Sequence, residues 1–339
     1  MAETTVNGLT SLVELAVLFA RLGTIAFGGP AAHVAMMDDE VVRRRGWLTR
    51  AQFLDYVGAT NLIPGPNSTE LAIHIGHARA GWPGLLVAGL CFIVPATLIV
   101  GALAALYVRY GSLPDVAGVL YGVKPVVIAI VAHALWALGR TAIKTPLLAA
   151  VTVAGVVAVA RGVPELLVLA AAAMVMILLH SAHRRWFTAM LGAVQLPASV
   201  SASALATTVA NFNLTTLFLT FAKIGAVLFG SGYVLLAFLR SEFVERLGWL
   251  TEQQLLDAIA VGQVTPGPLF TTATFVGYLL GGPVGALVAT IGIFLPAFVF
   301  VALSGPLVPR IRRSPAAGAA LDGVNAASLA LMAVVSWQL

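Results

Sequence analysis

Two halves of this chain repeat one pattern at a constant offset of 202 residues. The stretch 19–23 recurs at 221–225, and Gly46-Trp47-Leu48-Thr49 recurs at 248–251. The tripeptide Pro64-Gly65-Pro66 recurs at 266–268, and after one dropped residue the match continues to Trp136 and Trp337. Chance does not keep a register over that length, so an internal duplication is predicted. We expect a first repeat at 1–145, a connecting hairpin and linker span at 146–212, and a second repeat at 213–339.

Composition places these repeats in a membrane. Of the 339 residues, 60 % are hydrophobic and only 10 % are charged, whereas about a quarter of a soluble domain is charged. The predicted fold class is therefore an all-α polytopic membrane protein. The N-terminus has no basic region and no small-residue cleavage site, so we expect no signal peptide. A helix that crosses a bilayer needs about 20 apolar residues, and such spans are predicted at 9–27, 83–108, 116–139, 146–160 and 164–182, with a weaker one at 187–210.

The basic residues predict how the repeats are oriented. A net charge of +5 would suggest a nucleic-acid partner in a soluble chain. Here the arginines cluster between apolar spans, where they set membrane orientation, so no nucleic acid is expected. With 43–50 in the cytoplasm, the equivalent loops at 109 and 310–313 fall on opposite sides, provided that 187–210 crosses. Two inverted-topology repeats follow, as in many secondary transporters whose sites lie between broken helices at mid-membrane.

Each repeat carries a helix break inside apolar sequence. Proline fixes its own φ and cannot donate a backbone hydrogen bond, so no helix runs through either Pro-Gly-Pro. The helix that starts after each break has free N–H groups and partial positive charge, which attract anions. We therefore expect two half-helices to meet at mid-membrane around a negative solute. The substrate-binding residues predicted at the breaks are Pro64, Gly65, Pro66, Asn67, Ser68, Thr69, Pro266, Gly267, Pro268, Thr271 and Thr272.

Glycines and two cations complete the predicted anion site. Gly28, Gly29 and Gly230 lack a Cβ and let N–H groups approach a ligand closely. Arg21 and Lys223 occupy the same repeat position, and ionisable groups within membrane spans are functional by default. We expect both cations to face the central cavity. The alternative is that each reaches an interface or neutralises a neighbouring carboxylate such as Glu14.

Four further residues are candidates for carrying protons. Asp55 and Asp257 are equivalent in the repeat, and each is either structural, through Arg50 or a helix cap, or part of a gate or proton path. Glu70 and His74, with His77, share roughly one helix face after the first break, and histidine titrates near physiological pH. Thr272 replaces Glu70 in the second repeat. The alternative for this face is a polar surface packed on protein.

The chemistry expected of an enzyme is missing from the sequence. Cys91 is the single cysteine, and the six histidines show no metal-site spacing. There is no nucleophile–base pair, P-loop, dinucleotide fingerprint or zinc motif. We therefore expect no catalytic residue, no metal and no cofactor, and any pumping must use an ion gradient.

The motifs as a group resemble the chromate ion transporter (CHR) family in its long-chain, two-domain form. The first copy resembles it through Phe27-Gly28-Gly29-Pro30, through Gly46-Trp47-Leu48-Thr49 with Gln52-Phe53, and through Pro64-Gly65-Pro66 before Gly76; the second does so through 229–232, 248–251 and 265–268. The second copy departs from the first where Ser231-Gly232 replaces Gly29-Pro30.

The resemblance implies a multi-pass protein of the bacterial inner membrane that exports chromate, driven by the proton gradient, with sulfate as a related anion. Its expected partners are chromate, sulfate, protons and the lipid bilayer, and a homodimer is an open alternative. An uncoupled anion channel or uniporter and a non-transporting membrane scaffold are the competing functions. Repeat-paired charges within the membrane weigh against a scaffold, because their desolvation is costly.

Overall fold

The computed structural model describes residues 3–110, 142–184, 212–229, 234–304 and 315–338, with seven isolated positions between 129 and 140. The predicted span at 187–210 and most of the span at 116–139 lie outside the described residues, as does Gly230. Every element of the described part is helical, which confirms the all-α class. Three helical stretches there are long and apolar enough to cross a membrane: Asn67–Tyr110, Leu269–Ser304 and Pro315–Val334.

The first copy comprises α1 (Glu3–Ile25), α2 (Gly29–Asp38), the π-helical segment η1 (Asp39–Arg44), α3 (Arg50–Thr60) and α4 (Asn67–Tyr110). The second comprises α8 (Leu214–Val227), α9 (Leu235–Leu239), the π-helical segment η3 (Arg240–Arg246), α10 (Glu252–Val264), the 3-10 turn η4 (Leu269–Thr271) and α11 (Thr272–Ser304). The same order of elements therefore occurs twice. Helices α6 (Pro146–Ala160), α7 (Glu165–Arg184) and α13 (Pro315–Gln338) complete the described part.

Local sequence accounts for where the amphipathic helices begin. Thr49 caps α3 as predicted: its side chain accepts from the backbone of Gln52, and the Gln52 side chain accepts from the backbone of Thr49. Thr251 and Gln254 form the same reciprocal capping box at the start of α10. Each helix then ends before a Pro-Gly-Pro tripeptide, and the next helical turn begins directly after it.

Helices α4 and α11 are each a helical hairpin rather than one rod. Gly81 and Gly282 both have φ of 60° and leave helical geometry, as do the residues before them. Gly76 and Gly84 lie in direct backbone contact across the first turn. Residues eight apart in a continuous helix are about 12 Å apart, so the chain must fold back here. The short leg is the helix expected to start after the first break, and the long leg matches the span predicted at 83–108.

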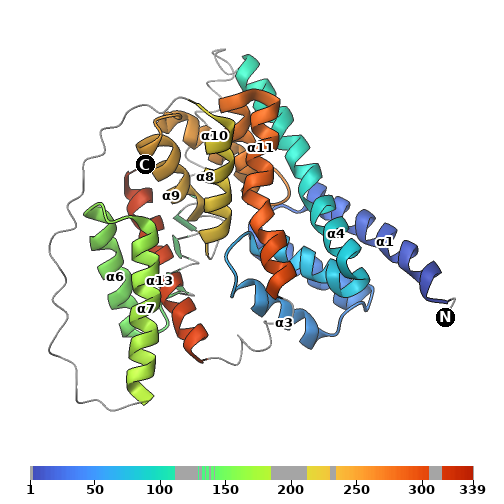
Figure 1. Ribbon diagram of the computed structural model, residues 1–339, viewed down its shortest axis with the longest axis horizontal. Helices are drawn as coiled ribbons and strands as arrows, with labels where there is room; N and C mark the ends of the chain where they lie inside the picture. Colours follow the sequence, from blue (N-terminus) through green and yellow to red (C-terminus); the bar gives the residue numbers. More distant parts are fainter. Residues whose placement is uncertain are drawn as a thin grey trace.

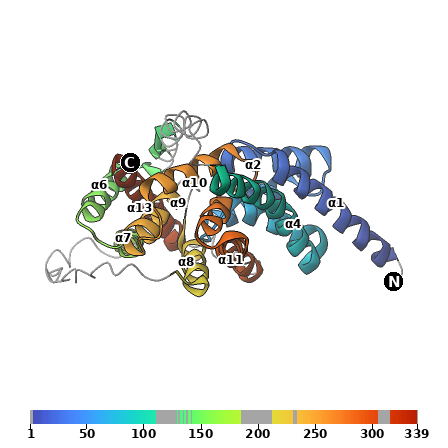
Figure 2. The same cartoon turned by 90° about the horizontal axis from the view of Figure 1, so that it is seen from above.

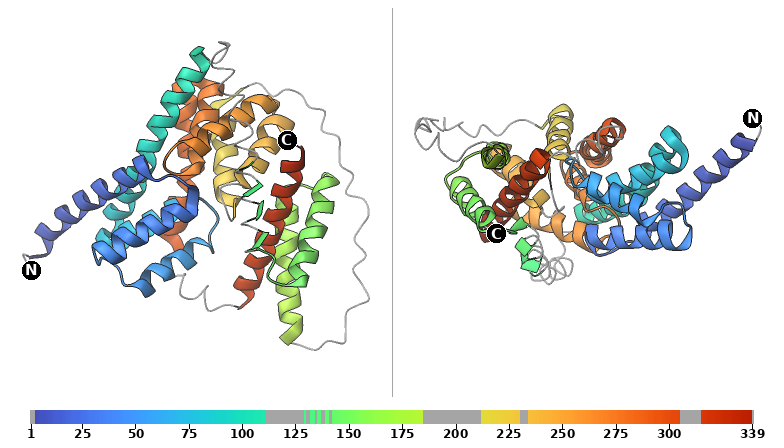
Figure 3. Two further views of the ribbon diagram at one scale, coloured as in Figure 1. Left: turned by 180° about the vertical axis from the view of Figure 1, so that it is seen from behind. Right: turned by 90° about the horizontal axis from the view of Figure 1, so that it is seen from below.

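The long legs of the two hairpins run in opposite directions. In Figure 1 the C-terminal end of α4 lies near the top of the molecule, whereas that of α11 lies near the bottom. Figure 3 shows the same relation from behind. The two hairpins pack on each other, α1 packs on α4, and α8 packs on α11 in the equivalent manner.

The remaining helices form a bundle beside this core. Helices α6 and α7 both pack against α13 (Figure 2). Gly155 of α6 approaches the Ala330 side chain, and Gly323 of α13 approaches the backbone of Ala172 in α7. Small residues allow such close helix contacts in a membrane, where apolar side chains gain little from leaving lipid. The hairpin at 146–182 therefore buries a face of the C-terminal helix, a role that the sequence analysis does not include.

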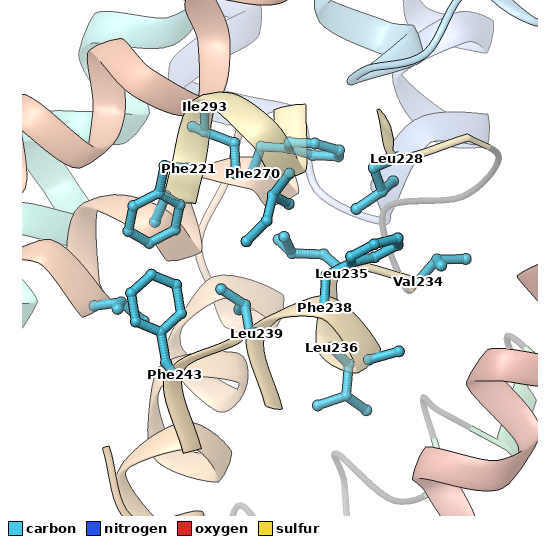
Figure 4. Packing of buried hydrophobic residues seen from close by; sticks show 14 of the residues in the cluster. Phe221, Leu228, Val234, Leu235, Leu236, Phe238, Leu239, Phe243, Phe270 and Ile293 are labelled. Carbon is cyan, nitrogen blue, oxygen red and sulfur yellow. The ribbon is translucent and has the colours of Figure 1, made fainter. Parts of the chain in front are cut away.

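The core of the second copy surrounds its short helix α9. Figure 4 shows Leu228, the residue after α8, facing Leu235 and Phe238 of α9, while Phe221 of α8 faces Phe243 of η3. Phe221 and Phe243 have ring centroids 4.8 Å apart. This packing fixes the end of α8, which is the point where the second copy reaches the first.

Candidate functional site

Each copy binds the helix break of the other through one backbone hydrogen bond. The N–H of Gly65 donates to the carbonyl of Leu228 over 2.8 Å, and the N–H of Gly267 donates to the carbonyl of Ala26 over 2.9 Å. Both partners keep the offset of 202 residues. The pair is therefore reciprocal, as expected for two copies related by an approximate two-fold axis. We call this pair of hydrogen bonds the crossover.

Glycine is required at both crossover donors. The φ angles of Gly65 and Gly267 are 138° and 90°, which side-chain-bearing residues rarely adopt. A Cβ on Gly267 would lie 2.8 Å from the carbonyl oxygen of Gly23. Both residues are buried. The Pro-Gly-Pro sequence thus serves to stop one helix and to bring a bare backbone against the other copy.

Helix α2 begins at Gly29, three residues after Ala26, which contacts the second break. Ala26 accepts the crossover bond, and Gly28 and Gly29 follow with φ of 99° and 75°. No side chain caps α2 at Gly28, so the first N–H groups of this helix are open to another acceptor. The crossover therefore brings predicted residues from both copies together. The equivalent Gly230 lies outside the described residues.

The helix after the first break carries buried polar groups without partners. Ser68, Thr69 and Glu70 are buried, and Glu70 is 0 % exposed. Neither carboxyl oxygen of Glu70, nor the Thr69 hydroxyl, nor Nε2 of His74 has a hydrogen-bond partner in the described part of the chain. The His74 ring stacks on Tyr56, with centroids 5.4 Å apart.

Two other polar residues near this helix point elsewhere. His77 is exposed and packs its ring against Trp82, so it does not join the buried group. Asn67 donates from its side chain to that of Asn61 over 2.9 Å, which ties the two sides of the break together.

The second break is lined by hydroxyls that are already satisfied. The hydroxyl of Thr271 donates to the carbonyl of Pro268, and that of Thr272 to the carbonyl of Leu269, each over 2.8 Å. Thr274 and Thr290 share a further hydrogen bond of 2.8 Å. All four side chains are buried. The two breaks therefore have the same backbone course but different capacity to accept a proton or a ligand.

Arg21 and Lys223 each form an ion pair with a buried carboxylate of their own copy. Arg21 Nη1 lies 3.4 Å from Glu40 Oε1, and Lys223 Nζ contacts Glu242. Neutralisation of a carboxylate was one alternative for these cations, but the partner of Arg21 is not Glu14. Glu14 pairs with Arg79, 3.2 Å away.

The cations keep accessible surface despite these pairs. The Arg21 side chain is 55 % exposed and that of Lys223 is 39 % exposed, whereas Glu40 and Glu242 are 10 % and 7 % exposed. Arg21 and Glu40 line a pocket of about 360 Å³ between α1 and the α2–η1 segment. Glu40 and Glu242 are not among the residues predicted from the sequence, although the offset of 202 residues connects them.

The two repeat-paired aspartates lie in different environments. Asp257 is 3 % exposed and accepts hydrogen bonds from Tyr107 of α4 (2.8 Å) and from Gln253 (3.0 Å). Asp55 is exposed, and Arg50 forms an ion pair with Asp38. Asp257 therefore links α10 to the first copy.

Comparison with known proteins gives the family. The model of the chromate transporter family matches the chain twice, over residues 13–209 and 215–339. A chromate transport protein of Cupriavidus metallidurans is 35 % identical over 94 % of this chain and 80 % of its own length. A probable chromate transport protein of Synechococcus elongatus is 32 % identical over 95 % and 83 %, and a chromate transport protein of Pseudomonas aeruginosa is 32 % identical over 95 % and 79 %. No solved structure matches the chain.

Matches of this extent to the family model and to three curated relatives establish the resemblance drawn from the motifs. The chain belongs to the chromate transporter family.

Proposed function

We propose that this protein is a secondary active transporter that exports chromate, or a closely related oxyanion, across the bacterial inner membrane in exchange for protons. The observation that carries the proposal is the crossover, in which Gly65 and Gly267 each bind the backbone of the opposite copy. A pair of broken helices held against each other is the arrangement in which many secondary transporters place their substrate.

Alternating access would use the two copies as opposed halves. We propose that residues 1–145 and 213–339 are repeats of inverted topology, with 146–212 connecting them. The opposite directions of the long legs of α4 and α11 support this proposal (Figure 1). Rocking of one copy against the other about the crossover would expose the site first to one side of the membrane and then to the other.

The relatives named as chromate transport proteins favour chromate as the substrate. The site would hold the dianion with N–H groups of the helix starts after Gly28 and the two breaks, and the positive charges of Arg21 and Lys223 would attract it from their own copies. Free N–H groups at helix starts bind anions without any base or metal. Sulfate is a tetrahedral dianion as well, so we expect it to compete. Ser68 and Thr69 would donate further hydrogen bonds from their hydroxyls at the first break. Thr271 and Thr272 could do so only by giving up the bonds that their hydroxyls donate within their own turn.

Proton coupling is proposed to use Glu70 and His74. A charged carboxylate without a partner is very costly in a buried site, so Glu70 is expected to be neutral in this conformation. Opening of the site to water during transport would remove that cost and release the proton. Asp257 is assigned a structural part in this scheme, because its carboxylate already accepts two hydrogen bonds.

The test is uptake of labelled chromate into inverted membrane vesicles energised with a proton gradient, with sulfate as competitor. Accumulation that collapses with an uncoupler is the expected result. Downhill flux that ignores the proton gradient would mean an uncoupled channel or uniporter. If neither anion moved across the membrane, the protein would be a non-transporting membrane scaffold and the proposal would be wrong.

A further inference from the structure

Two clusters of ion pairs lie side by side in each copy, and they differ in how their charges repeat. The first surrounds Asp38, which pairs with Arg43 and Arg50; the second surrounds Glu40. Both clusters have counterparts 202 residues later in the chain. A cluster whose charges change sign between the copies serves only as a contact, whereas a cluster whose charges keep their sign can be a site that needs that sign.

The cluster around Asp38 is inverted in the second copy. There Arg240 occupies the place of the aspartate and pairs with Glu245 over 2.9 Å and Glu252 over 2.8 Å. Each of the three residues has changed sign, yet both ion pairs are present. We call these the inverted triads. An ion pair holds its two segments together with either polarity, so the inversion indicates that only the contact matters here.

The cluster around Glu40 keeps its signs. Glu40 contacts Arg21 at 3.4 Å and Arg44 at 3.5 Å. In the second copy Glu242 contacts Lys223, and Arg246 at 2.6 Å. We call these the sign-kept triads. Each consists of one buried carboxylate and two partly exposed cations.

Within each sign-kept triad and its direct ion-pair partners, cations outnumber carboxylates. Arg44 also pairs with Asp39 at 2.7 Å, and Arg45 adds a cation 3.2 Å from Glu40. In the second copy Arg246 also lies 3.4 Å from the hydroxyl of Thr220, which is neutral. Three cations against two carboxylates in one copy, and two against one in the other, leave one excess positive charge in each.

Membrane topology by itself would remove this excess from one copy. If the copies are inverted, their equivalent positions lie on opposite sides of the membrane, and positive charge is favoured on the cytoplasmic side only. The inverted triads follow that rule, because the first carries one excess positive charge and the second one excess negative charge. The sign-kept triads do not follow it. In the second copy the excess negative charge of the inverted triad offsets the excess positive charge of the sign-kept triad, so topology accounts for the sum over the two triads but not for which of them keeps its sign. An anion bound at the sign-kept triads would account for that choice.

We propose that the sign-kept triads are two equivalent oxyanion sites, in which Arg44 and Arg246 are specificity-determining residues beside Arg21 and Lys223. The proposal deepens the proposed function and rests on it for the identity of the anion. The buried carboxylate of each triad is a positioning residue that holds its two cations in place. Arg44 and Arg246 are the last residues of the π-helical segments η1 and η3, and such segments are frequent at functional sites.

The pocket of the first copy gives the anion room. Arg21 and Arg44 line the space of about 360 Å³ together with the two carboxylates that pair with them, Asp39 and Glu40. A water molecule occupies about 30 Å³ in the liquid, so a tetrahedral anion fits with part of its hydration shell. The Arg44 side chain is 61 % exposed and has donors left over after its ion pairs.

The experiment measures equilibrium binding of radiolabelled chromate, and separately of sulfate, to the purified full-length protein, together with the KM and maximal rate of transport in vesicles. The variants are Arg44→Gln, Arg246→Gln and the charge-retaining Arg44→Lys. In Arg44→Gln the carboxylate of Glu40 keeps Arg21 and Arg45, so the buried charge is not left alone. The matched control inverts the neighbouring triad by Asp38→Arg, Arg43→Glu and Arg50→Glu, which copies the polarity of the second repeat.

We expect each glutamine variant to weaken anion binding at its own site by about ten- to a hundredfold, the range for losing a charge-assisted hydrogen bond, while the other site still binds. KM should rise in both variants, because transport uses both sites. Arg44→Lys should recover most of the affinity, and the control should bind as the unmodified protein does. Unchanged binding in both glutamine variants, or an equal loss in the control, would overturn the inference. An unmodified protein that binds neither anion would overturn it as well. Binding without transport would instead refute only the proposed function.

Discussion

The two helix breaks share a backbone and differ in chemistry. Both have a buried glycine with positive φ that donates to the opposite copy. After the first break, Glu70 is fully buried without a hydrogen-bond partner among the described residues. After the second, Thr272 donates its hydroxyl to a carbonyl of its own turn. Duplication has thus preserved the crossover in both copies, whereas the group that could carry a proton is present in one.

The largest effect is expected from Gly267→Ala at the crossover. The new Cβ would lie 2.8 Å from the carbonyl oxygen of Gly23, and the residue would be held at φ of 90°. Backbone strain costs about 1–3 kcal/mol, and overpacking a comparable amount. We expect the free energy of unfolding in detergent to fall by about 3 kcal/mol or more and transport to be lost.

Gly65→Ala changes the equivalent residue of the first break, so its loss of stability can be compared with that of Gly267→Ala. The nearest backbone atom to its Cβ is the Gly225 carbonyl oxygen at 3.7 Å, and the close contact with Glu70 involves a side chain that can move. The loss should therefore stay within the strain of about 1–3 kcal/mol. Gly248→Ala, with φ of 63° and no atom within 4 Å, is the control at about 1–2 kcal/mol. Equal losses in all three variants would show that the crossover has no special packing.

Glu70→Met should separate stability from coupling. An apolar side chain of similar shape removes a buried polar group without a partner, which stabilises the folded protein by about 1–3 kcal/mol. The same change removes the proposed proton carrier, so chromate accumulation should no longer depend on the proton gradient. Thermal unfolding and vesicle uptake are the two measurements.

The matched change in the second copy is Thr272→Val, which deletes a satisfied hydroxyl. Here stability should decrease by about 1 kcal/mol while coupling remains. A Glu70→Met variant that is destabilised, or that still accumulates chromate with the gradient, would contradict the assignment of Glu70.

Replacing Asp257 should lower the free energy of unfolding far more than replacing Asp55, because Asp257 is buried and Asp55 is exposed. Asp257→Ala leaves the Tyr107 hydroxyl without its acceptor at a contact between α10 and α4. We expect the free energy of unfolding to fall by about 2–3 kcal/mol. Asp55→Ala changes an exposed side chain and should cost about 0.5 kcal/mol or less. If Asp55→Ala were fully stable but defective in transport, Asp55 would instead be part of a gate or proton path, which is the alternative predicted for both aspartates.

Local features of the fold could be predicted from the sequence because their causes are local. The cap at Thr49, the start of a helix after Pro66 and the turn near residue 80 each depend on a few neighbouring residues. Apolar spans and the duplication are visible as patterns of composition and spacing. The all-α class follows from them.

Contacts between distant segments could not be predicted in the same way. In the sequence, Glu14 lies two helical turns before Arg21 and is the nearest candidate partner, but the structure pairs Arg21 with Glu40, 19 residues later. That partner depends on how α2 and η1 fold back on α1. The crossover likewise joins residues more than 160 positions apart, which no spacing rule specifies. The unequal burial of Asp55 and Asp257 is a further result of tertiary packing that equivalence in the repeat conceals.

The two helix caps test whether the copies are alike at positions outside the proposed site. Thr49 and Thr251 cap α3 and α10 through identical reciprocal bonds to Gln52 and Gln254. Removing such a cap costs about 1 kcal/mol. Thr49→Ala and Thr251→Ala should therefore lower the free energy of unfolding equally, with transport per folded molecule unchanged. Serine at either position keeps the oxygen and should restore stability. If one alanine variant lost transport while the other did not, the difference between the copies would extend from the breaks to the helices that lead into them.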